Sequence, residues 1–209
     1  MYGSAWYIHK KPIPLPINRE HILALGDNFK GIYRVLWFTL YLTGGRIGEV
    51  LKLRRDDFSI QETEKGKVLL VNLYTEKNKR MDFRNIPILD GGVYSEMLKP
   101  LLGEIDKCEY GMPIFPMTYD TAQKQFAKIK IIVRATHHKE VIDDYKLKLR
   151  SHYLRHCRLT HLVTIHNYNE FQLMQFAGWT NIKPASFYVR LGWRDLVAKQ
   201  MTNYNLLQV

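Results

Sequence analysis

Residues 32–53 read IYRVLWFTLYLTGGRIGEVLKL, an apolar segment followed by a glycine pair and an arginine. The apolar residues recur at helical spacing, which predicts a buried helix that stops at Gly44-Gly45. A second, short helix is predicted to carry Arg46 and Glu49, with Glu49 orienting the helix. The amides at its start favour an anion, and arginine adds a planar, permanently charged fork that suits phosphate. An exposed Arg46–Glu49 pair one turn apart explains the same residues without any ligand.

The segments outside this stretch predict an α+β, mostly helical domain with one small antiparallel sheet. Residues 67–74 are β-rich and residues 81–88 alternate weakly between apolar and polar. The polar residues 75–80 between them predict the turn of a hairpin. Asn18 suits the N-cap of a first helix. The further predicted helices cover residues 18–26, 92–102, 121–135, 152–165, 170–177 and 194–201.

The length of 209 residues suits one compact domain, and 46% hydrophobic with 24% charged residues is an ordinary globular balance. Residues 8–17, HKKPIPLPIN, contain three prolines. We therefore expect residues 1–17 to form an extended lead-in and residues 18–209 to form the domain. No apolar run reaches the roughly 18 residues of a membrane span, and the start lacks the apolar core of a secretory signal. A cytoplasmic protein is expected.

The charge of the chain favours a polyanionic partner. Thirty-one Lys and Arg against twenty Asp and Glu give a formal charge of +11. Residues 121–160 alone contain ten basic and three acidic residues, a net charge of +7. Nucleic acid and an anionic membrane surface are both possible partners for such a chain. A solvated basic face is the ordinary alternative, so the charge supports only a lean toward nucleic acid.

Two further clusters contain residues suited to phosphodiester chemistry. Residues 152–156 read HYLRH, where His152 and Arg155 share one face of the predicted helix. A neutral histidine beside a phosphate-binding arginine suits proton transfer, although a basic DNA-binding helix explains the pair about as well. Trp179 lies nine positions before Tyr188, and its indole N–H can donate a hydrogen bond to a phosphate oxygen. Taken singly, both aromatic residues are explained equally well by core packing.

In this order the clusters resemble the catalytic domain of the tyrosine recombinase superfamily, the integrase and Xer-type site-specific DNA recombinases. The family's first arginine box corresponds to residues 43–53, TGGRIGEVLKL. Its His-x-x-Arg box corresponds to residues 152–155, and its Gly-His or Gly-Trp box to residues 178–179. Its nucleophile is a tyrosine about nine residues further on. Most members carry an N-terminal clamp domain, so the resemblance makes residues 1–17 the remnant of a linker to a missing DNA-binding domain.

The resemblance implies that a tyrosine cleaves DNA through a 3′-phosphotyrosyl bond, with no metal, ATP or other cofactor. Two arginines and the tryptophan would stabilise the charge on the phosphate, a lysine of the hairpin turn would protonate the leaving 5′ oxygen, and the histidine would assist at the tyrosine. Lys77 matches that lysine best, with Lys79 as the fallback. The implied catalytic residues are Arg46, Lys77, His152, Arg155, Trp179 and Tyr188. The expected DNA contacts are Lys79, Arg80, Lys124, Lys128, Lys130 and Arg150.

Double-stranded DNA is the expected partner, bound by a homo-tetramer that is monomeric or weakly associated when free. Integration by a virus or another mobile element is the expected task because it is frequent in the family. A type IB topoisomerase and a catalytically inactive DNA-binding relative are the alternatives. A membrane-surface protein is disfavoured because no basic amphipathic helix has a broad apolar face. A zinc enzyme using His137, His138 and Cys157 is disfavoured because their spacing matches no recognised ligand set.

Overall fold

The computed structural model describes residues 17–64, 66–75, 83–135 and 151–189, and within them it confirms a mostly helical α+β domain. The helices are α1 (Arg19–Gly26), α2 (Ile32–Thr43), α3 (Ile47–Leu51), α4 (Val93–Ile105), α5 (Tyr119–Ala135), α7 (Ser151–Thr164) and α8 (Glu170–Ala177). Two 3₁₀ turns, η1 (Arg55–Asp57) and η2 (Ala185–Phe187), accompany them. The strands are β1 (Phe58–Thr63), β2 (Gly66–Tyr74) and β3 (Phe83–Leu89). The predicted helix over residues 194–201 lies outside the described residues.

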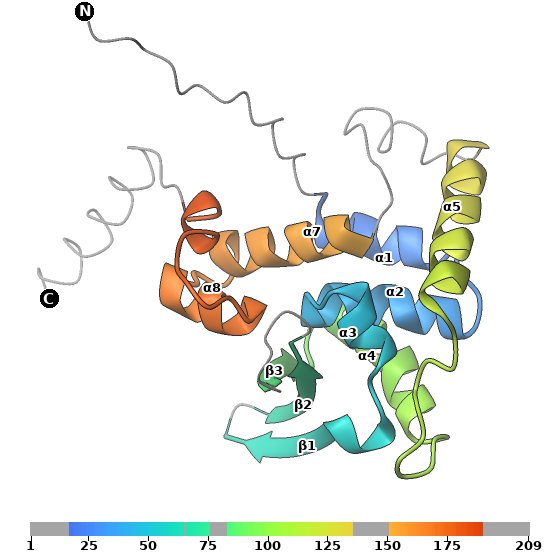
Figure 1. Ribbon diagram of the computed structural model, residues 1–209, viewed down its shortest axis with the longest axis horizontal. Coiled ribbons are helices and arrows are strands. Elements are labelled where there is room, and N and C mark those ends of the chain that lie inside the picture. Colours follow the sequence, from blue (N-terminus) through green and yellow to red (C-terminus); the bar gives the residue numbers. More distant parts are fainter. Residues whose placement is uncertain (1–16, 65, 76–82, 136–150, 190–209) are drawn as a thin grey trace, which may run out of the picture.

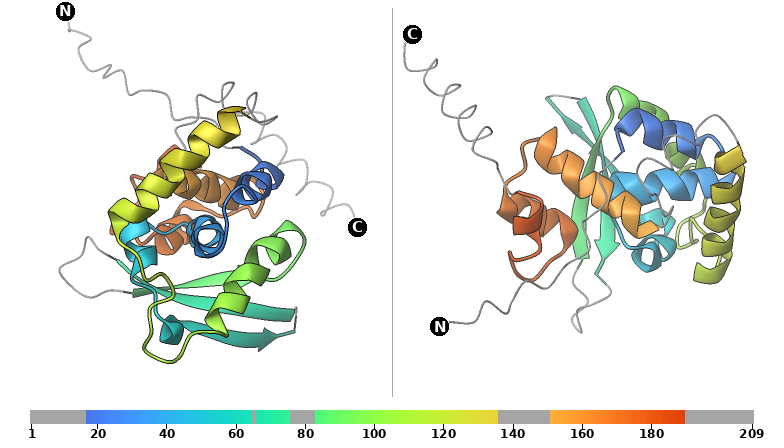
Figure 2. Two further views of the ribbon diagram at one scale, coloured as in Figure 1. Left: turned by 90° about the vertical axis from the view of Figure 1, so that its right-hand side faces the viewer. Right: turned by 90° about the horizontal axis from the view of Figure 1, so that it is seen from above.

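Helix α2 forms the centre of the core, because every residue from Val35 to Thr43 is buried. It packs against α4 and α7, while the sheet lies along one side of the molecule beneath the helices (Figures 1 and 2). The helix ends where predicted, since Gly44 takes a left-handed conformation with a φ of 57°. Asn18 caps α1 as predicted, its side chain accepting a hydrogen bond from the His21 amide at 2.7 Å. The glycine pair therefore ends the buried helix α2 and places Arg46 directly before α3, at the edge of the core.

The sheet is antiparallel in the order β1-β2-β3, and its second and third strands form the predicted hairpin. Along β3, alternate residues are buried, and Ile86 faces inward opposite Val71 of β2. Strand β1 was not predicted. After Phe58 its side chains are all exposed, and only two apolar residues, Phe58 and Ile60, alternate with polar ones, which is too short a pattern to predict a strand. Strand β1 forms because its backbone pairs with that of β2, and residue types do not reveal such pairing.

Two glycines make a matched test of how closely α1 packs on α2. A Cβ at Gly26 would lie 2.3 Å from the Phe38 ring, whereas a Cβ at Gly103 of α4 would meet nothing within 4 Å. Gly26→Ala is therefore expected to lower the free energy of unfolding by about 1–3 kcal/mol. Gly103→Ala is expected to raise it by roughly 0.5–1 kcal/mol, because alanine favours the helix. Urea unfolding of both variants measures the difference; equal values would contradict the packing.

Candidate active site

Arg46 stands at the junction that α2 and α3 create. Its backbone N–H donates to Glu49 Oε2 at 2.9 Å, and its Nη1 donates to Glu49 Oε1 at 2.6 Å. Gly45 allows the close turn, since a Cβ there would lie 2.7 Å from Val50 and 2.8 Å from Leu73. Glu49 thus orients the short helix, as the sequence predicted, and it also orients the arginine at the start of that helix. The Arg46 side chain keeps 23% of its surface exposed, which leaves it able to bind a ligand.

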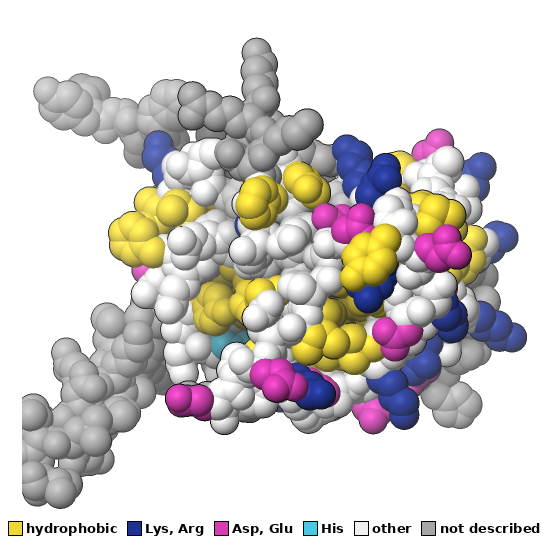
Figure 3. All heavy atoms as spheres, turned by 90° about the horizontal axis from the view of Figure 1, so that it is seen from below, with side chains coloured by type: hydrophobic (Ala, Val, Ile, Leu, Met, Phe, Trp, Pro, Cys, Tyr) yellow, Lys and Arg dark blue, Asp and Glu magenta, His cyan; other side chains and the backbone are white. Residues whose placement is uncertain are grey.

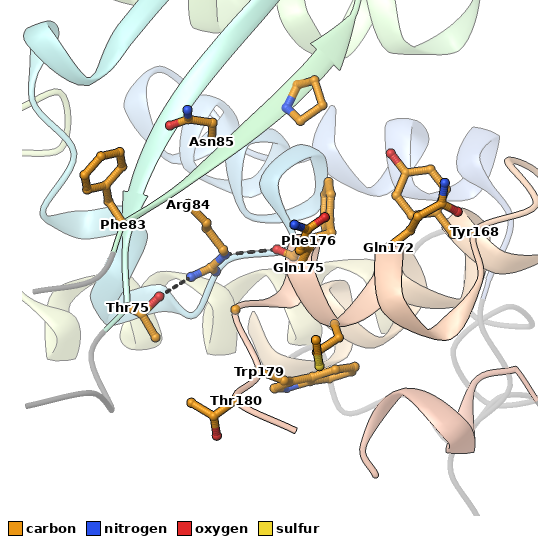
Figure 4. A pocket seen from close by; sticks show the side chains of 13 residues that line it. Thr75, Phe83, Arg84, Asn85, Tyr168, Gln172, Gln175, Phe176, Trp179 and Thr180 are labelled. Carbon is orange, nitrogen blue, oxygen red and sulfur yellow. Dashed lines mark hydrogen bonds between the residues drawn. The ribbon is translucent and has the colours of Figure 1, made fainter. Parts of the chain in front are cut away.

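Arg84 of β3 holds Glu49 from the other side. Its Nη2 donates to Glu49 Oε2 at 2.8 Å, while its Nη1 and Nε donate to Thr75 Oγ1 and to the Phe176 carbonyl, each at 3.0 Å (Figure 4). Burial alone would raise the pKa of Glu49, but Arg84 and Arg46 outweigh burial and hold that pKa below its usual value. The Glu49 carboxylate is therefore ionised and fixed, and it connects the sheet to Arg46.

Arg155 of α7 is buried, with 3% of its surface exposed. Its Nη1 donates to the Gly44 carbonyl at 2.6 Å and its Nη2 donates to the Ala177 carbonyl at 2.8 Å. Burial, together with the positive charges of Arg46 and Arg84, lowers the pKa of Arg155 to about 10. It remains protonated at neutral pH. The structure thus brings the first arginine box, the His-x-x-Arg box and the end of α8 together at one guanidinium.

Trp179 and Tyr188 lie beside this arginine. Gly178, with a φ of 65°, ends α8 in a left-handed cap, and the Trp179 amide then donates to the Met174 carbonyl at 3.0 Å. The Trp179 ring lies 5.7 Å from the guanidinium carbon of Arg155 and stacks on the Tyr188 ring at 5.8 Å. Burial raises the pKa of Tyr188, although the charge of Arg155 opposes this effect. Tyr188 is therefore a neutral phenol at pH 7.

His152 reaches the site from another side. It is exposed, and together with Arg46 it lines a cavity of about 610 Å³ between the start of α3, the start of α5 and the start of α7. A second cavity, of about 690 Å³, lies on the other side of Arg84 between β3 and α8, and Trp179 lines it (Figure 4). The sequence predicted that His152 and Arg155 share one face of a helix. In the structure they differ in burial, because the histidine is exposed and the arginine is buried.

Several predicted site residues fall outside the described part of the chain. These are Lys77, Lys79, Arg80 and Arg150, together with the side chain of Lys130. Lys124 and Lys128 are described, and both are exposed on α5 while Phe126 of the same helix is buried in the core. Helix α5 packs against α3, so this basic face begins next to the cavity that holds Arg46.

No group of three or more His, Cys, Asp or Glu within the described residues is placed to hold a metal ion. Cys108 and Cys157 are free thiols, and His137 and His138 lie outside the described residues. Among the helices that the structure describes, none is long and apolar enough to cross a membrane.

Three residues near the site were missed by the sequence analysis. Arg84 shares the inward face of β3 with Ile86 and Ile88, and this alternation could have revealed it as a buried charge. The His156 ring lies 5.5 Å from the Tyr188 ring, so a histidine lies next to this tyrosine. Arg158, one turn after Arg155, is also buried. The aromatic rings around it come from α2, α4 and α8, so no local sequence pattern could have predicted these contacts.

A helical domain with a small sheet, in which two arginines, a tryptophan and a tyrosine gather, has the fold of a tyrosine recombinase catalytic domain. Residues 20–192 match the model of the Phage integrase family, and the chain belongs to this family. The resemblance seen in the sequence is thereby confirmed. A comparison with curated proteins found no match.

Solved structures with this fold include three recombinases. XerH site-specific recombinase bound to difH substrate has a TM-score of 0.62 at 18% identity, over 90% of this chain and 53% of that chain. XerA recombinase has a TM-score of 0.61 at 16% identity, over 93% of this chain and 66% of that chain. The Tn1549 transposon integrase in complex with circular intermediate DNA has a TM-score of 0.63 at 18% identity, over 93% and 68%. The chain thus spans about half of the XerH chain and about two thirds of the other two.

Proposed function

We propose that this chain is the catalytic part of a site-specific DNA recombinase or integrase that cleaves and rejoins DNA through a 3′-phosphotyrosyl intermediate. The observation that carries the proposal is the position of Arg155. Its guanidinium lies between the backbone of the first arginine box and the end of α8, with Trp179 against it and Tyr188 stacked on Trp179. A buried cation, an indole and a phenol thus lie next to one another, which supports roles in charge stabilisation and nucleophilic attack.

In this mechanism the Tyr188 phenol oxygen attacks the scissile phosphorus. The P–O5′ bond breaks, and the tyrosine is joined to the 3′ phosphate, which splits one difficult displacement into two. Arg46 and Arg155 bind the non-bridging oxygens as their charge develops, and the indole N–H of Trp179 donates a further hydrogen bond. His152 accepts the phenol proton, and Lys77 gives a proton to the leaving 5′ oxygen. Because the phosphotyrosyl bond keeps the energy of the phosphodiester, rejoining needs neither ATP nor a metal ion.

DNA binding in this proposal is mostly electrostatic. On the face shown in Figure 3, Lys and Arg side chains gather toward the end of the molecule where α5 lies. Lys124 and Lys128 are exposed on α5, and in the sequence the +7 segment continues past them. Phosphate contacts release counterions, so affinity should fall steeply with salt. We expect a homo-tetramer on DNA and action in the cytoplasm of the host cell, on a viral or mobile element.

The decisive experiment incubates the chain in EDTA with nicked duplexes that carry candidate sites, followed by SDS gel electrophoresis. The expected result is an SDS-resistant protein–DNA adduct, since a nick lets the 5′-hydroxyl fragment diffuse away and traps the tyrosine on the 3′ phosphate. Salt-dependent binding without an adduct would favour the inactive DNA-binding relative. Relaxation of supercoiled plasmid without joining of two sites would favour the topoisomerase. Absence of DNA binding would contradict the whole proposal.

A further inference from the structure

Arg84 of β3 is buried, with 8% of its surface exposed, and its three hydrogen bonds reach three separate parts of the chain. It donates to Glu49 of α3 and, as Figure 4 shows, to Thr75 directly after β2 and to the Phe176 carbonyl of α8. It also packs under the turn that follows α8, since a Cβ at Gly178 would lie 2.9 Å from its Nη1. One guanidinium thus joins the first arginine box, the strand that leads into the hairpin turn and the end of α8.

Glu49 links Arg84 to Arg46. The Glu49 side chain is fully buried, and its Oε1 accepts a hydrogen bond from Arg46 Nη1 at 2.6 Å. Its Oε2 accepts from Arg84 Nη2 at 2.8 Å and from the Arg46 amide at 2.9 Å. Helix α3 has only five residues, so its own hydrogen bonds hold it weakly. The bond to Arg84 anchors Oε2 on the sheet, and this fixes the direction in which Oε1 holds the Arg46 guanidinium.

We propose that Arg84 is a positioning residue for DNA cleavage: through Glu49 it holds the Arg46 guanidinium in the orientation that binds the scissile phosphate. The inference rests on the proposed function, in which Arg46 binds the phosphate oxygens as their charge develops. Arg84 does not replace Arg46 in that role, because its Nε, Nη1 and Nη2 each donate to a protein acceptor. A misplacement of about 1 Å can slow a reaction by about 10²-fold. Loss of Arg84 should therefore slow cleavage while DNA affinity stays nearly unchanged.

A purely structural role for Arg84 gives a different expectation. Removing Arg84 would then slow cleavage by the same factor whether or not Arg46 is present, because the two side chains would act independently. In the proposed role the slowing passes through Arg46, so it disappears once the Arg46 side chain is removed. The double-mutant cycle of Arg84→Met and Arg46→Ala separates the two roles.

The test measures single-turnover adduct formation on a nicked duplex for the four proteins of this cycle, with a native gel for DNA affinity. Arg84→Met should slow adduct formation about 10²-fold when Arg46 is present, and by no more than about twofold in the Arg46→Ala background, which is the usual error of additivity. Arg34→Met is the control: it removes an arginine from an ion pair with Asp27 (2.7 Å) at the opposite end of α2, and it should leave the rate unchanged. Equal slowing in both backgrounds, or none in either, would overturn the proposal, as would a loss of DNA affinity as large as the loss of rate.

Urea unfolding of the same proteins separates this inference from the proposed function. In the Arg46→Ala background, Arg84 is the last charged partner of the buried Glu49 carboxylate within the described residues, so Arg84→Met should lower the urea midpoint more there than in the unaltered protein. If the unaltered protein forms no adduct, the proposed function fails, and this comparison decides alone: equal falls in the midpoint would overturn the link through Glu49. If a protein with Arg84→Met does not fold, Arg84→Lys takes its place, because it keeps the charge and loses the planar fork. It should still slow cleavage only where Arg46 is present, and an unaltered rate in Arg84→Lys would overturn the proposal.

Discussion

Tyr188→Phe is expected to form no covalent adduct with a nicked duplex while binding DNA with nearly unchanged affinity. The substitution removes one oxygen and keeps the ring, so the stacking on Trp179 and the contact with His156 persist. Arg155 keeps both of its backbone hydrogen bonds, since neither involves the phenol. The variant therefore separates the nucleophile from every other part of the site.

Tyr168→Phe is the matched control. Tyr168 packs its ring edge against Phe176 and lines the cavity beyond Arg84, so it lies near the site without contacting Arg155 in the described structure. It should form the adduct at the rate of the unaltered protein. The measurement is the yield of SDS-resistant complex over time, with a native gel for binding. An adduct formed equally well by Tyr188→Phe would overturn the assignment of the nucleophile.

Arg46→Ala is expected to slow adduct formation by about 10²–10³-fold, equivalent to roughly 3–4 kcal/mol, and to change DNA affinity far less. The reason is that, in the proposed mechanism, its guanidinium acts on charge that develops during cleavage. Its loss should leave the fold intact, because Glu49 keeps its ion pair with Arg84 at 2.8 Å. Single-turnover cleavage at saturating protein measures the rate, and titration on a native gel measures the affinity. A variant that lost affinity alone would make Arg46 an ordinary phosphate contact.

Arg155→Ala provides the contrast and Lys107→Ala the control. Arg155→Ala should slow cleavage as much as Arg46→Ala does, and should also destabilise the protein, because the Gly44 and Ala177 carbonyls lose their partner at ~1–3 kcal/mol for each unsatisfied group. Lys107, two residues past the end of α4, is 72% exposed, and its removal should change neither quantity. Urea unfolding beside the cleavage assay distinguishes the two arginines. Equal stability of the two arginine variants would contradict the buried role of Arg155.

The sequence predicted most of the fold because its elements carry strong local signals. The apolar period of α2, the stop at Gly44 and the cap at Asn18 are readable from residue types alone, and all three are confirmed. Strand β1 could not be predicted, since its exposed and mostly polar residues resemble a loop until β2 pairs with them. Local pattern thus defines the elements that pack on the core and misses the element defined by backbone pairing.

The candidate site divides in the same way. The order of the boxes was enough to nominate Arg46, Arg155, Trp179 and Tyr188, which the structure brings together. Arg84 was not nominated, because its importance comes from Glu49 and the Phe176 carbonyl, 35 and 92 positions away in the chain. Contacts of such separation depend on the tertiary fold. The catalytic roles, and the lysines of the hairpin turn, stay predictions for the cleavage assays.

The two carbonyls at the end of α8 have a consequence for protein engineering. Phe176 and Ala177 present consecutive backbone oxygens to Arg84 of the sheet and to Arg155 of α7. A hybrid that exchanged only residues 170–189 with those of another integrase would have to reproduce both oxygens against arginines it did not bring along. Residues 170–189 should therefore be exchanged together with β3 and α7. Shuffling libraries with crossovers between these elements are expected to yield few active members.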